Sequence, residues 1–218
     1  MKKFLILALA IMTLAVPATA GITTFTSPIE GSPDAIWPGW NLIALPGIPL
    51  NPDPPSIFGS IPITPSKLYR FNAATKSFIP YDEWAPYEFG GMLLTDGYWL
   101  NSDTSCRFSY EGLNDNESMD IWVSLPKTGW TLMGNPFNRE FTWADAKVTD
   151  GNITVSLETA GRTHGWLSTV AWWWDAQSQS LRTLGLPDDF PAAESMAAWH
   201  GYWVESFVDK IALIFETP

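Results

Sequence analysis

Few residues of this 218-residue sequence have the types and spacing of a catalytic site. Its two histidines, His164 and His200, stand outside any HExxH or CxxC pattern, and no G-x-S-x-G elbow or phosphate-binding glycine loop occurs. A pair of carboxylates that are close only in space, as in glycosidases, remains an open route to catalysis. The acidic residues considered for such a pair are Asp82, Glu83, Glu88, Asp188, Asp189 and Glu194. Because such residues occur in any acidic protein, we predict no catalytic residues, no cofactor and no enzyme, and keep a secreted hydrolase as a second alternative.

An oxygen-rich stretch at residues 115–120 (DNESMD) is the one segment with a composition suited to calcium. It lacks the ligand spacing of an EF-hand and the glycine of that loop. We therefore interpret it as a solvated junction and predict no metal site, while calcium binding at this stretch stays open.

Tryptophan is the most informative residue type, because the chain contains 13 of them. Burying all of them would leave some indole N–H groups without hydrogen-bond partners, so several are expected at the surface. A flat exposed indole beside Asp, Asn or Gln can stack on the apolar face of a sugar ring. Tryptophan is equally favoured at protein–protein contacts.

Three sequence blocks occur twice, in the same order. The matches are residues 39–46 (GWNLIALP) with 129–136 (GWTLMGNP), 69–72 (YRFN) with 172–175 (WWWD), and 97–100 (GYWL) with 201–204 (GYWV). Such self-similarity indicates two copies of one module. We predict a first β repeat over residues 21–112 and a second over residues 113–218.

Comparison of the two copies sorts the aromatic residues. Positions that are aromatic in both copies are interpreted as core: Trp40/Trp130, Tyr69/Trp172, Phe71/Trp174 and Trp99/Trp203. A tryptophan matched by a polar residue is expected to face water, as with Trp173, which matches Arg70, and Trp199, which matches Thr95. The predicted ligand- or partner-binding residues are these two tryptophans together with Trp166 and Trp84, which lie in loops without clear equivalents.

Short β-prone runs between polar turns predict an all-β fold with little helix. Such runs flank a turn at residues 72–76 (NAATK) and again at 175–179 (DAQSQ), which predicts a hairpin in each copy. Residues 150–152 (DGN) precede an alternating run and predict an added hairpin in the second copy. Only residues 191–199 have a helix-like composition. Because the junction is short, we predict that the copies pack as a pseudo-two-fold barrel or sandwich.

The first twenty residues have the pattern of a secretory signal peptide. Lys2 and Lys3 precede an apolar run at 4–16, and residues 18–20 (ATA) fit a cleavage site. The run is shorter than the roughly 18–20 residues that span a bilayer. We therefore expect a mature chain that is secreted, periplasmic or at the cell surface, with no membrane span after signal removal.

Charge and cysteine content exclude some classes of partner and cross-link. The net charge of −11 argues against nucleic acid or anionic lipid, because both are bound through clustered Lys and Arg. Cys106 is the only cysteine, so no intrachain disulfide can form. Its equivalent in the second copy is Ile211, which favours a small buried apolar role.

The paired motifs GWNLIALP and GWTLMGNPF, the later GYWL and GYWV, and residues 141–148 (FTWADAKV) resemble a repeat of exported bacterial β-rich proteins. That family has duplicated GWN(L/M)IG-NP and GYW motifs and no agreed activity. The resemblance covers nearly the whole mature chain and implies an exported β architecture without catalytic residues. The first copy departs from the pattern at Ala44 and Leu45, where the motif has Gly-Asn, and continues into a proline-rich loop.

Together these features predict a non-enzymatic exported module for binding or assembly at the cell surface or in the extracellular matrix. Its expected partner is a protein or a second copy of the chain. A carbohydrate-binding module with a polysaccharide ligand is the first alternative. The sequence leaves open the oligomeric state and whether the copies share one core.

Overall fold

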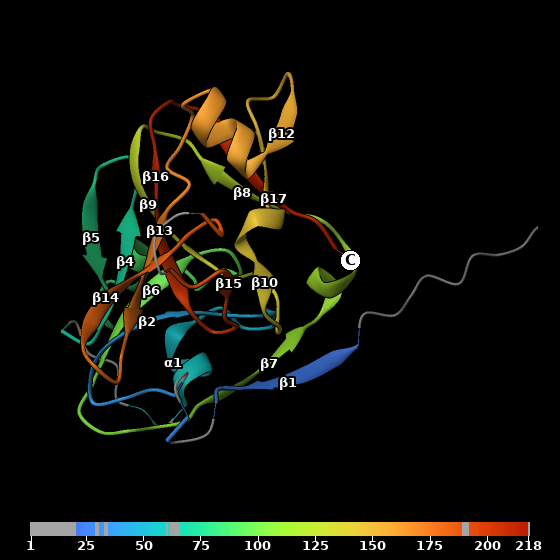
Figure 1. Cartoon of the computed structure of the whole chain (residues 1–218). Helices are drawn as coiled ribbons and strands as arrows, with labels where there is room; N and C mark the ends of the chain where they lie inside the picture. The colour runs from blue at the N-terminus through green and yellow to red at the C-terminus, as the bar shows by residue number, and fades with distance from the viewer. Residues whose placement is uncertain are drawn as a thin grey trace, which may run out of the picture.

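The protein is described by a computed structural model covering residues 21–28, 31–32, 35–59, 61, 66–188 and 192–217. The predicted signal peptide lies outside the described residues. The described chain is mostly β-strand, which confirms the all-β prediction. Its sheets are small and antiparallel and form a propeller-like ring (Figure 1), an arrangement that does not support the predicted barrel or sandwich packing.

The described strands follow one another along the chain with short loops between most of them. The first half contains β1 (Ile22–Thr26), β2 (Gly39–Ala44), β3 (Ile48–Pro49), β4 (Leu68–Asn72), β5 (Ser77–Pro80), β6 (Gly97–Ser102) and β7 (Ser109–Leu113). The second half contains β8 (Ile121–Leu125), β9 (Gly129–Gly134), β10 (Phe141–Thr142), β11 (Lys147–Thr149), β12 (Thr154–Ser156), β13 (Ala171–Asp175), β14 (Ser180–Leu184), β15 (Ser195–Met196), β16 (Gly201–Ser206) and β17 (Ile211–Phe215).

Helical segments are short. They are α1 (Pro54–Phe58), α2 (Pro86–Phe89), η1 (Asp115–Ser118), η2 (Trp143–Asp145) and η3 (Thr159–Thr163). Proline opens both α1 and α2, where its missing N–H costs no helical hydrogen bond. The helix suggested at 191–199 is wrong, because the described part of that segment contains β15 and ends at Trp199 with a φ of 69°. Within the described ranges, no helix is both long and apolar enough to cross a bilayer.

Two four-stranded sheets have the same strand order. The β2 sheet runs β2-β6-β4-β5, and the β9 sheet runs β9-β16-β13-β14. Their registers also agree, since Gly39 pairs with Ser102 as Gly129 pairs with Ser206. The predicted hairpins β4–β5 and β13–β14 are confirmed, and so is the added hairpin β11–β12.

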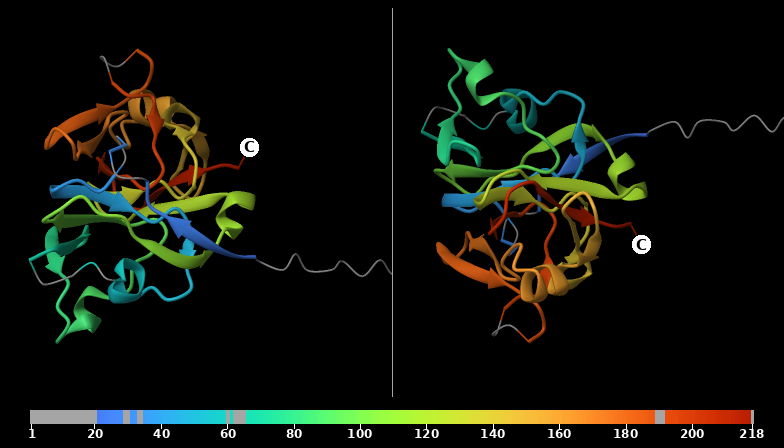
Figure 2. Two further views of the ribbon diagram at one scale, coloured as in Figure 1. Left: turned by 90° about the horizontal axis from the view of Figure 1, so that it is seen from below. Right: turned by 90° about the horizontal axis from the view of Figure 1, so that it is seen from above.

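The two other main sheets also correspond to each other. The order β1-β7-β3 in the first half is matched by β8-β17-β11 in the second, to which the added hairpin contributes β12. A small sheet of β10 and β15 completes the set of described sheets. In Figure 2 the first half, coloured blue to green, lies largely on one side of the molecule, and the orange segments of the second half lie on the other.

Each half has its own cluster of buried hydrophobic side chains. The first core gathers such side chains between Phe25 and Tyr110 and takes in Trp199 from the second half. The second core gathers those between Ile121 and Phe215, with Leu94 of the first half packed against it. Each half therefore has its own core, and each core is contacted by a side chain of the other half. The halves thus pack against each other and are not two separate domains joined by a linker.

The β2 and β9 sheets meet at the ends of β2 and β9 through contacts that occur in equivalent pairs. The Ala44 N–H donates a hydrogen bond to the Trp199 carbonyl oxygen at 2.8 Å, and the Gly134 N–H donates to the Thr95 carbonyl oxygen at 2.9 Å. Ala44 and Gly134 are equivalent in the repeat, as are Trp199 and Thr95. Each half therefore gives the other the same backbone hydrogen bond.

The junction between the halves is held by a buried asparagine. The Asn116 side-chain amide donates hydrogen bonds to the carbonyl oxygen of Pro46, at 2.9 Å, and to that of Pro136. These two prolines are also equivalent in the repeat. Asn116 is fully buried, so the interpretation of residues 115–120 as a solvated junction is wrong at this position. Its neighbour Glu117 accepts hydrogen bonds from the Asn138 N–H and from Arg139, so its oxygens support the fold.

Candidate functional site: an aromatic groove

Aromatic side chains cover the faces of the β2 and β9 sheets that point away from the two cores. Side chains alternate between the two faces of a strand. Because Ile43 and Met133 enter the cores, Trp40 and Trp130 three positions earlier lie on the opposite face. We call this surface the aromatic groove. Its members are Trp40, Tyr69, Phe71, Phe78 and Trp99 from the β2 sheet, and Trp130, Trp172, Trp174, Leu181 and Trp203 from the β9 sheet.

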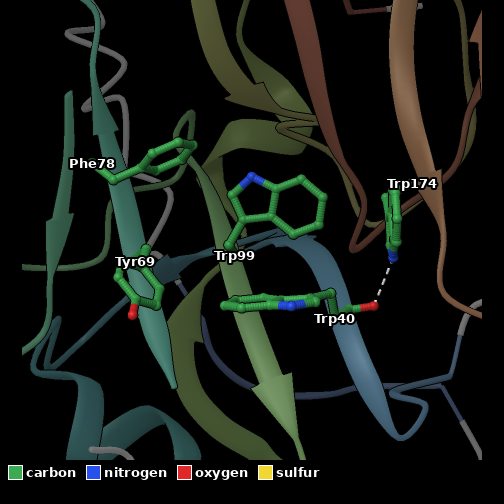
Figure 3. Close-up of a pocket in the computed structure, with 5 residues that line it drawn as sticks. All are labelled: Trp40, Tyr69, Phe78, Trp99 and Trp174. Carbon is green, nitrogen blue, oxygen red and sulfur yellow. Dashed lines mark hydrogen bonds between the residues drawn. The ribbon is translucent and has the colours of Figure 1, made fainter. Parts of the chain in front are cut away.

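The groove contains two hollows that share part of their walls. The first, about 370 Å³, is lined by Trp40, Tyr69, Phe78, Trp99 and Trp174 (Figure 3). The second, about 470 Å³, is lined by Phe71, Phe78, Trp99, Trp130, Trp172, Trp174, Leu181 and Trp203. Both volumes fall within the range of roughly 300–1,000 Å³ that is usual for ligand sites.

Every residue of the first hollow has its repeat equivalent in the second. The pairs are Trp40/Trp130, Tyr69/Trp172, Phe78/Leu181, Trp99/Trp203 and Trp174/Phe71. The hairpin registers support the third pair, because Phe71 is opposite Phe78 as Trp174 is opposite Leu181. The groove therefore offers the same type of site twice, with small differences in shape.

Ring contacts fix the groove before any ligand is present. Trp99 contacts Trp174 edge to face, with ring centroids 5.4 Å apart. The equivalent contact joins Trp203 and Phe71 at 4.8 Å. The Trp174 Nε1 also donates a hydrogen bond to the Trp40 carbonyl oxygen at 2.8 Å, drawn in Figure 3. Edge-to-face aromatic pairs add about 0.5–1.5 kcal/mol each beyond area burial, so these side chains lose little further freedom on binding.

Polar side chains stand beside the indoles, while the lining itself carries no charge. Asn101 is directly opposite Trp40 across the sheet, and Glu205 is opposite Trp130 at the equivalent position. Directly opposed residues have Cβ atoms about 4.5–5.5 Å apart, within reach of a ligand that covers the ring. Gln179 binds the backbone of Trp40 through both amide atoms, at 2.9 Å each. The groove thus combines apolar ring faces with hydrogen-bonding groups at their borders.

Two of the four tryptophans predicted to face solvent, Trp199 and Trp173, pack against the cores instead. Trp199 is only 6% exposed and packs its ring against Phe108 and Tyr110 of the first core. Trp173 is half-buried against the second core, with its Nε1 buried, and its ring lies 5.5 Å from that of His200. The pairs interpreted as core instead line the groove. These four shared pairs therefore mark the groove, whereas the shared pair Tyr98/Tyr202 is buried in the cores.

The error at Trp173 has a physical cause in its repeat equivalent. Arg70 faces the inner side of the β2 sheet, where its guanidinium pairs with Asp96 at 3.0 Å and donates to the Phe89 carbonyl oxygen. In the second copy, His200 replaces Asp96 where Trp173 replaces Arg70. The first copy thus has a partly buried ion pair where the second copy has a pair of rings. An arginine at residue 70 therefore did not mean that the equivalent tryptophan faces solvent. The sequence feature that could have revealed this is that both residues of the pair differ together between the copies.

The two remaining predicted residues lie outside the groove. Trp84 is 87% exposed in the loop before α2, beside the exposed Tyr87. Trp166 is half-buried and stacks on His164 at 4.7 Å. The structure therefore does not assemble the four predicted tryptophans into one site.

The acidic residues considered for catalysis do not line the groove. Burial, followed by the charges of Asp53, Glu83 and Asp82, raises the pKa of Tyr81, which directly precedes two of the acidic residues considered. Asp189 lies outside the described residues. No group of three or more His, Cys, Asp or Glu side chains suited to a metal ion is found in the part of the chain that the structure describes.

The equivalence of the Arg70–Asp96 and Trp173–His200 pairs can be tested by replacing the first pair with the residues of the second. Burial raises the pKa of Asp96, although Arg70 lowers it. Arg70→Trp removes the guanidinium and is expected to lower the free energy of unfolding by about 2 kcal/mol at pH 7. Arg70→Trp combined with Asp96→His is expected to recover at least half of that loss. Urea unfolding of both single variants and of the double variant measures the coupling energy between residues 70 and 96. If the changes in the free energy of unfolding simply add, the two residues do not act as a pair and the prediction is wrong.

The pH dependence of the Arg70→Trp variant has a defined sign. Loss of Arg70 raises the folded-state pKa of Asp96 further above its unfolded value of about 3.9. The destabilisation caused by the unpaired Asp96 carboxylate is therefore absent below about pH 4, where this group is protonated in both the folded and the unfolded state. It grows as the pH rises through the folded-state pKa of Asp96. The difference in stability from the wild-type protein should shrink on acidification, and should not do so in the double variant.

The duplicated motifs of the repeat correspond to the strands that carry the groove. The GW blocks form β2 and β9, the GYW blocks form β6 and β16, and each supplies one groove indole. The resemblance to exported bacterial repeat proteins stays a prediction. No family model, curated protein or solved structure matches the chain.

Proposed function

We propose that this protein is a non-enzymatic, exported binding module that holds its ligand in the aromatic groove. The observation that carries the proposal is the pair of equivalent aromatic hollows on one surface. Phe78, Trp130, Trp172 and Leu181 remain 50%, 39%, 37% and 53% exposed there, although they are large apolar side chains. Contiguous exposed apolar surface on a folded domain is typical of an interaction site. Preset rings are typical of a site that binds without reorganisation.

We also infer that the halves, residues 21–112 and 113–218, are two copies of one module related by an approximate two-fold axis. Equal strand order in both main pairs of sheets, and equal register in the β2 and β9 sheets, support this inference. Reciprocal hydrogen bonds at Ala44 and Gly134 support it as well, since a two-fold contact repeats each interaction in both directions. The axis passes close to these two residues and to Asn116, and the groove lies across it.

The signal-like residues 1–20 support export, and the groove has no arginine or lysine among its lining residues to attract nucleic acid. Of the partners predicted from the sequence, a second copy that offers the same concave groove is a poor fit, because two concave surfaces leave both hollows unfilled. Glycan chains and extended peptides both have the shape to enter such a groove.

Fluorine NMR of protein labelled with 5-fluorotryptophan tests the site with probes of several chemical classes. Single Trp→Phe variants assign the resonances of the six groove indoles, and buried Trp143 and exposed Trp84 and Trp122 serve as references. The probes are neutral soluble polysaccharides, a proline-rich peptide and a dilution series of the protein. At least one probe should shift the groove resonances more than those of Trp84 and Trp122. Unchanged groove resonances with every probe would reject the proposal.

A further inference from the structure

Resting on the proposed function, we infer that the ligand of the aromatic groove is a neutral glycan chain, with one sugar unit stacked in each hollow. Pyranose rings present flat C–H faces and a rim of hydroxyl groups. The groove presents the complementary pattern, with indole and phenol faces in the hollows and polar side chains at their borders.

The arrangement of polar groups favours a sugar over a purely apolar ligand. Asn101 and Glu205 occupy equivalent positions opposite Trp40 and Trp130, one beside each hollow. An amide donates and accepts hydrogen bonds, and a carboxylate accepts them, so both can bind hydroxyl groups of a ring stacked on the neighbouring indole. A ligand without hydroxyl groups would leave these side chains partly desolvated and without new partners.

Charge selects a neutral chain. The lining of both hollows carries no charged side chain, and the whole protein has a net charge of −11. A polyanion such as a uronic-acid polymer would meet repulsion from the whole protein and no basic side chain among the lining residues. The nearest basic group at the border is Lys76, which lies beside Gly129, and Glu205 opposite Trp130 offsets its charge. A neutral chain incurs neither cost.

The area of the groove argues against a protein partner. A stable protein–protein contact buries about 800 Å² on each partner and needs a complementary convex surface. Only four large apolar side chains of the groove, Phe78, Trp130, Trp172 and Leu181, are more than a third exposed. A thin chain with a repeating unit fits two adjoining equivalent hollows better than one broad partner surface does.

Two equivalent hollows predict a dependence on chain length. A ligand that reaches both hollows binds the second as an intramolecular step, so its affinity exceeds that of a ligand confined to one. The hollows are continuous through Phe78, Trp99 and Trp174, so a single chain can lie across the approximate axis. We expect a hexasaccharide to bind at least about tenfold more tightly than the disaccharide of the same series.

Affinity gel electrophoresis with hydroxyethyl cellulose, glucomannan, xylan and, as the charged comparison, alginate tests the inference. At least one neutral polymer should retard the wild-type protein, and alginate should not. Tyr69→Ala in the first hollow and Trp130→Ala in the second should each weaken retardation about tenfold, and the double variant should migrate as in the empty gel. Trp122→Ala is the matched control, because Trp122 is 60% exposed on β8 and lies outside the groove lining. Trp130→Phe keeps a ring and should retain most of the binding, which separates ring loss from misfolding.

Two results would overturn the inference. Retardation that survives the Tyr69→Ala/Trp130→Ala double variant would place the sugar elsewhere. Absence of retardation by every neutral polymer, while a peptide shifts the groove resonances of the fluorotryptophan-labelled protein, would reject a glycan and leave the proposed function standing. If no probe of any class shifts those resonances, the proposed function itself fails.

Discussion

Gly134→Ala is expected to lower the free energy of unfolding by about 3 kcal/mol or more, the upper range for overpacking a buried contact. A Cβ at this position would lie closer to the Ala44 Cβ than two carbon atoms can approach. The surrounding backbone cannot move away easily, because Gly134 donates a hydrogen bond to Thr95 and Ala44 donates one to Trp199. Relief requires separating the β2 and β9 sheets at their closest approach. Urea unfolding followed by tryptophan fluorescence measures the loss.

The compensating variant Ala44→Gly is the control. In the double variant Ala44→Gly/Gly134→Ala, one methyl group again occupies the contact, now supplied by the other strand. The next neighbour of the new Cβ is the Asp96 carbonyl oxygen at 3.1 Å, which is tight but tolerable with a small shift. The double variant should therefore be more stable than Gly134→Ala alone. A Gly134→Ala protein within 1 kcal/mol of wild type, roughly the cost of an ordinary substitution, would contradict the described contact.

This contact also explains a difference between the two matched sequence blocks. The block at residues 39–46 has Ala44 where the block at residues 129–136 has Gly134. Because a Cβ at residue 134 would lie against the Ala44 Cβ, one methyl group fits between the strands and two do not. Alanine at residue 44 is thus compatible with the fold only while residue 134 is glycine.

Asn116→Asp is expected to destabilise the protein by about 3–5 kcal/mol at pH 7, the range for an uncompensated buried charge. The wild-type amide donates to the carbonyl oxygens of Pro46 and Pro136 in a fully buried position. A carboxylate of the same shape has no proton to donate and would face two carbonyl oxygens instead. The variant therefore loses the hydrogen bonds that join Pro46 and Pro136 through Asn116. Because Asn and Asp have nearly the same volume, the loss of stability comes from these bonds and the charge and not from packing.

The pH dependence distinguishes the charge from the missing donors. Burial beside two carbonyl oxygens places the folded-state pKa of the new carboxyl above its unfolded value of about 3.9. The charge penalty is therefore absent below about pH 4, where the protonated acid can still donate one hydrogen bond, and grows with rising pH. Asn116→Ala removes both donors without a charge, so its loss should not depend on pH. Equal pH profiles for the two variants would contradict the proposed role of Asn116.

The sequence determined the local and repetitive features of the molecule. Alternation and turn residues predicted the hairpins at 72–76, 175–179 and 150–152, because these depend on neighbouring residues alone. The repeated blocks predicted which segments are equivalent, and equal strand order and register followed in both sheets. Composition also directed attention to tryptophan as the residue type on which a binding site would depend.

Only the tertiary structure decided which face of each strand meets a core. Period-two alternation separates Trp172 and Trp174 from Trp173 but does not say which set is inside, since all three are apolar. The contact partners decide it. Trp173 packs on His200, which directly precedes β16. Trp174 contacts Trp99 of the β2 sheet, and Trp172 lines the groove and is partly exposed to solvent. The groove arises from contacts between residues about a hundred positions apart in the chain, and no local pattern encodes which of those distant surfaces will meet.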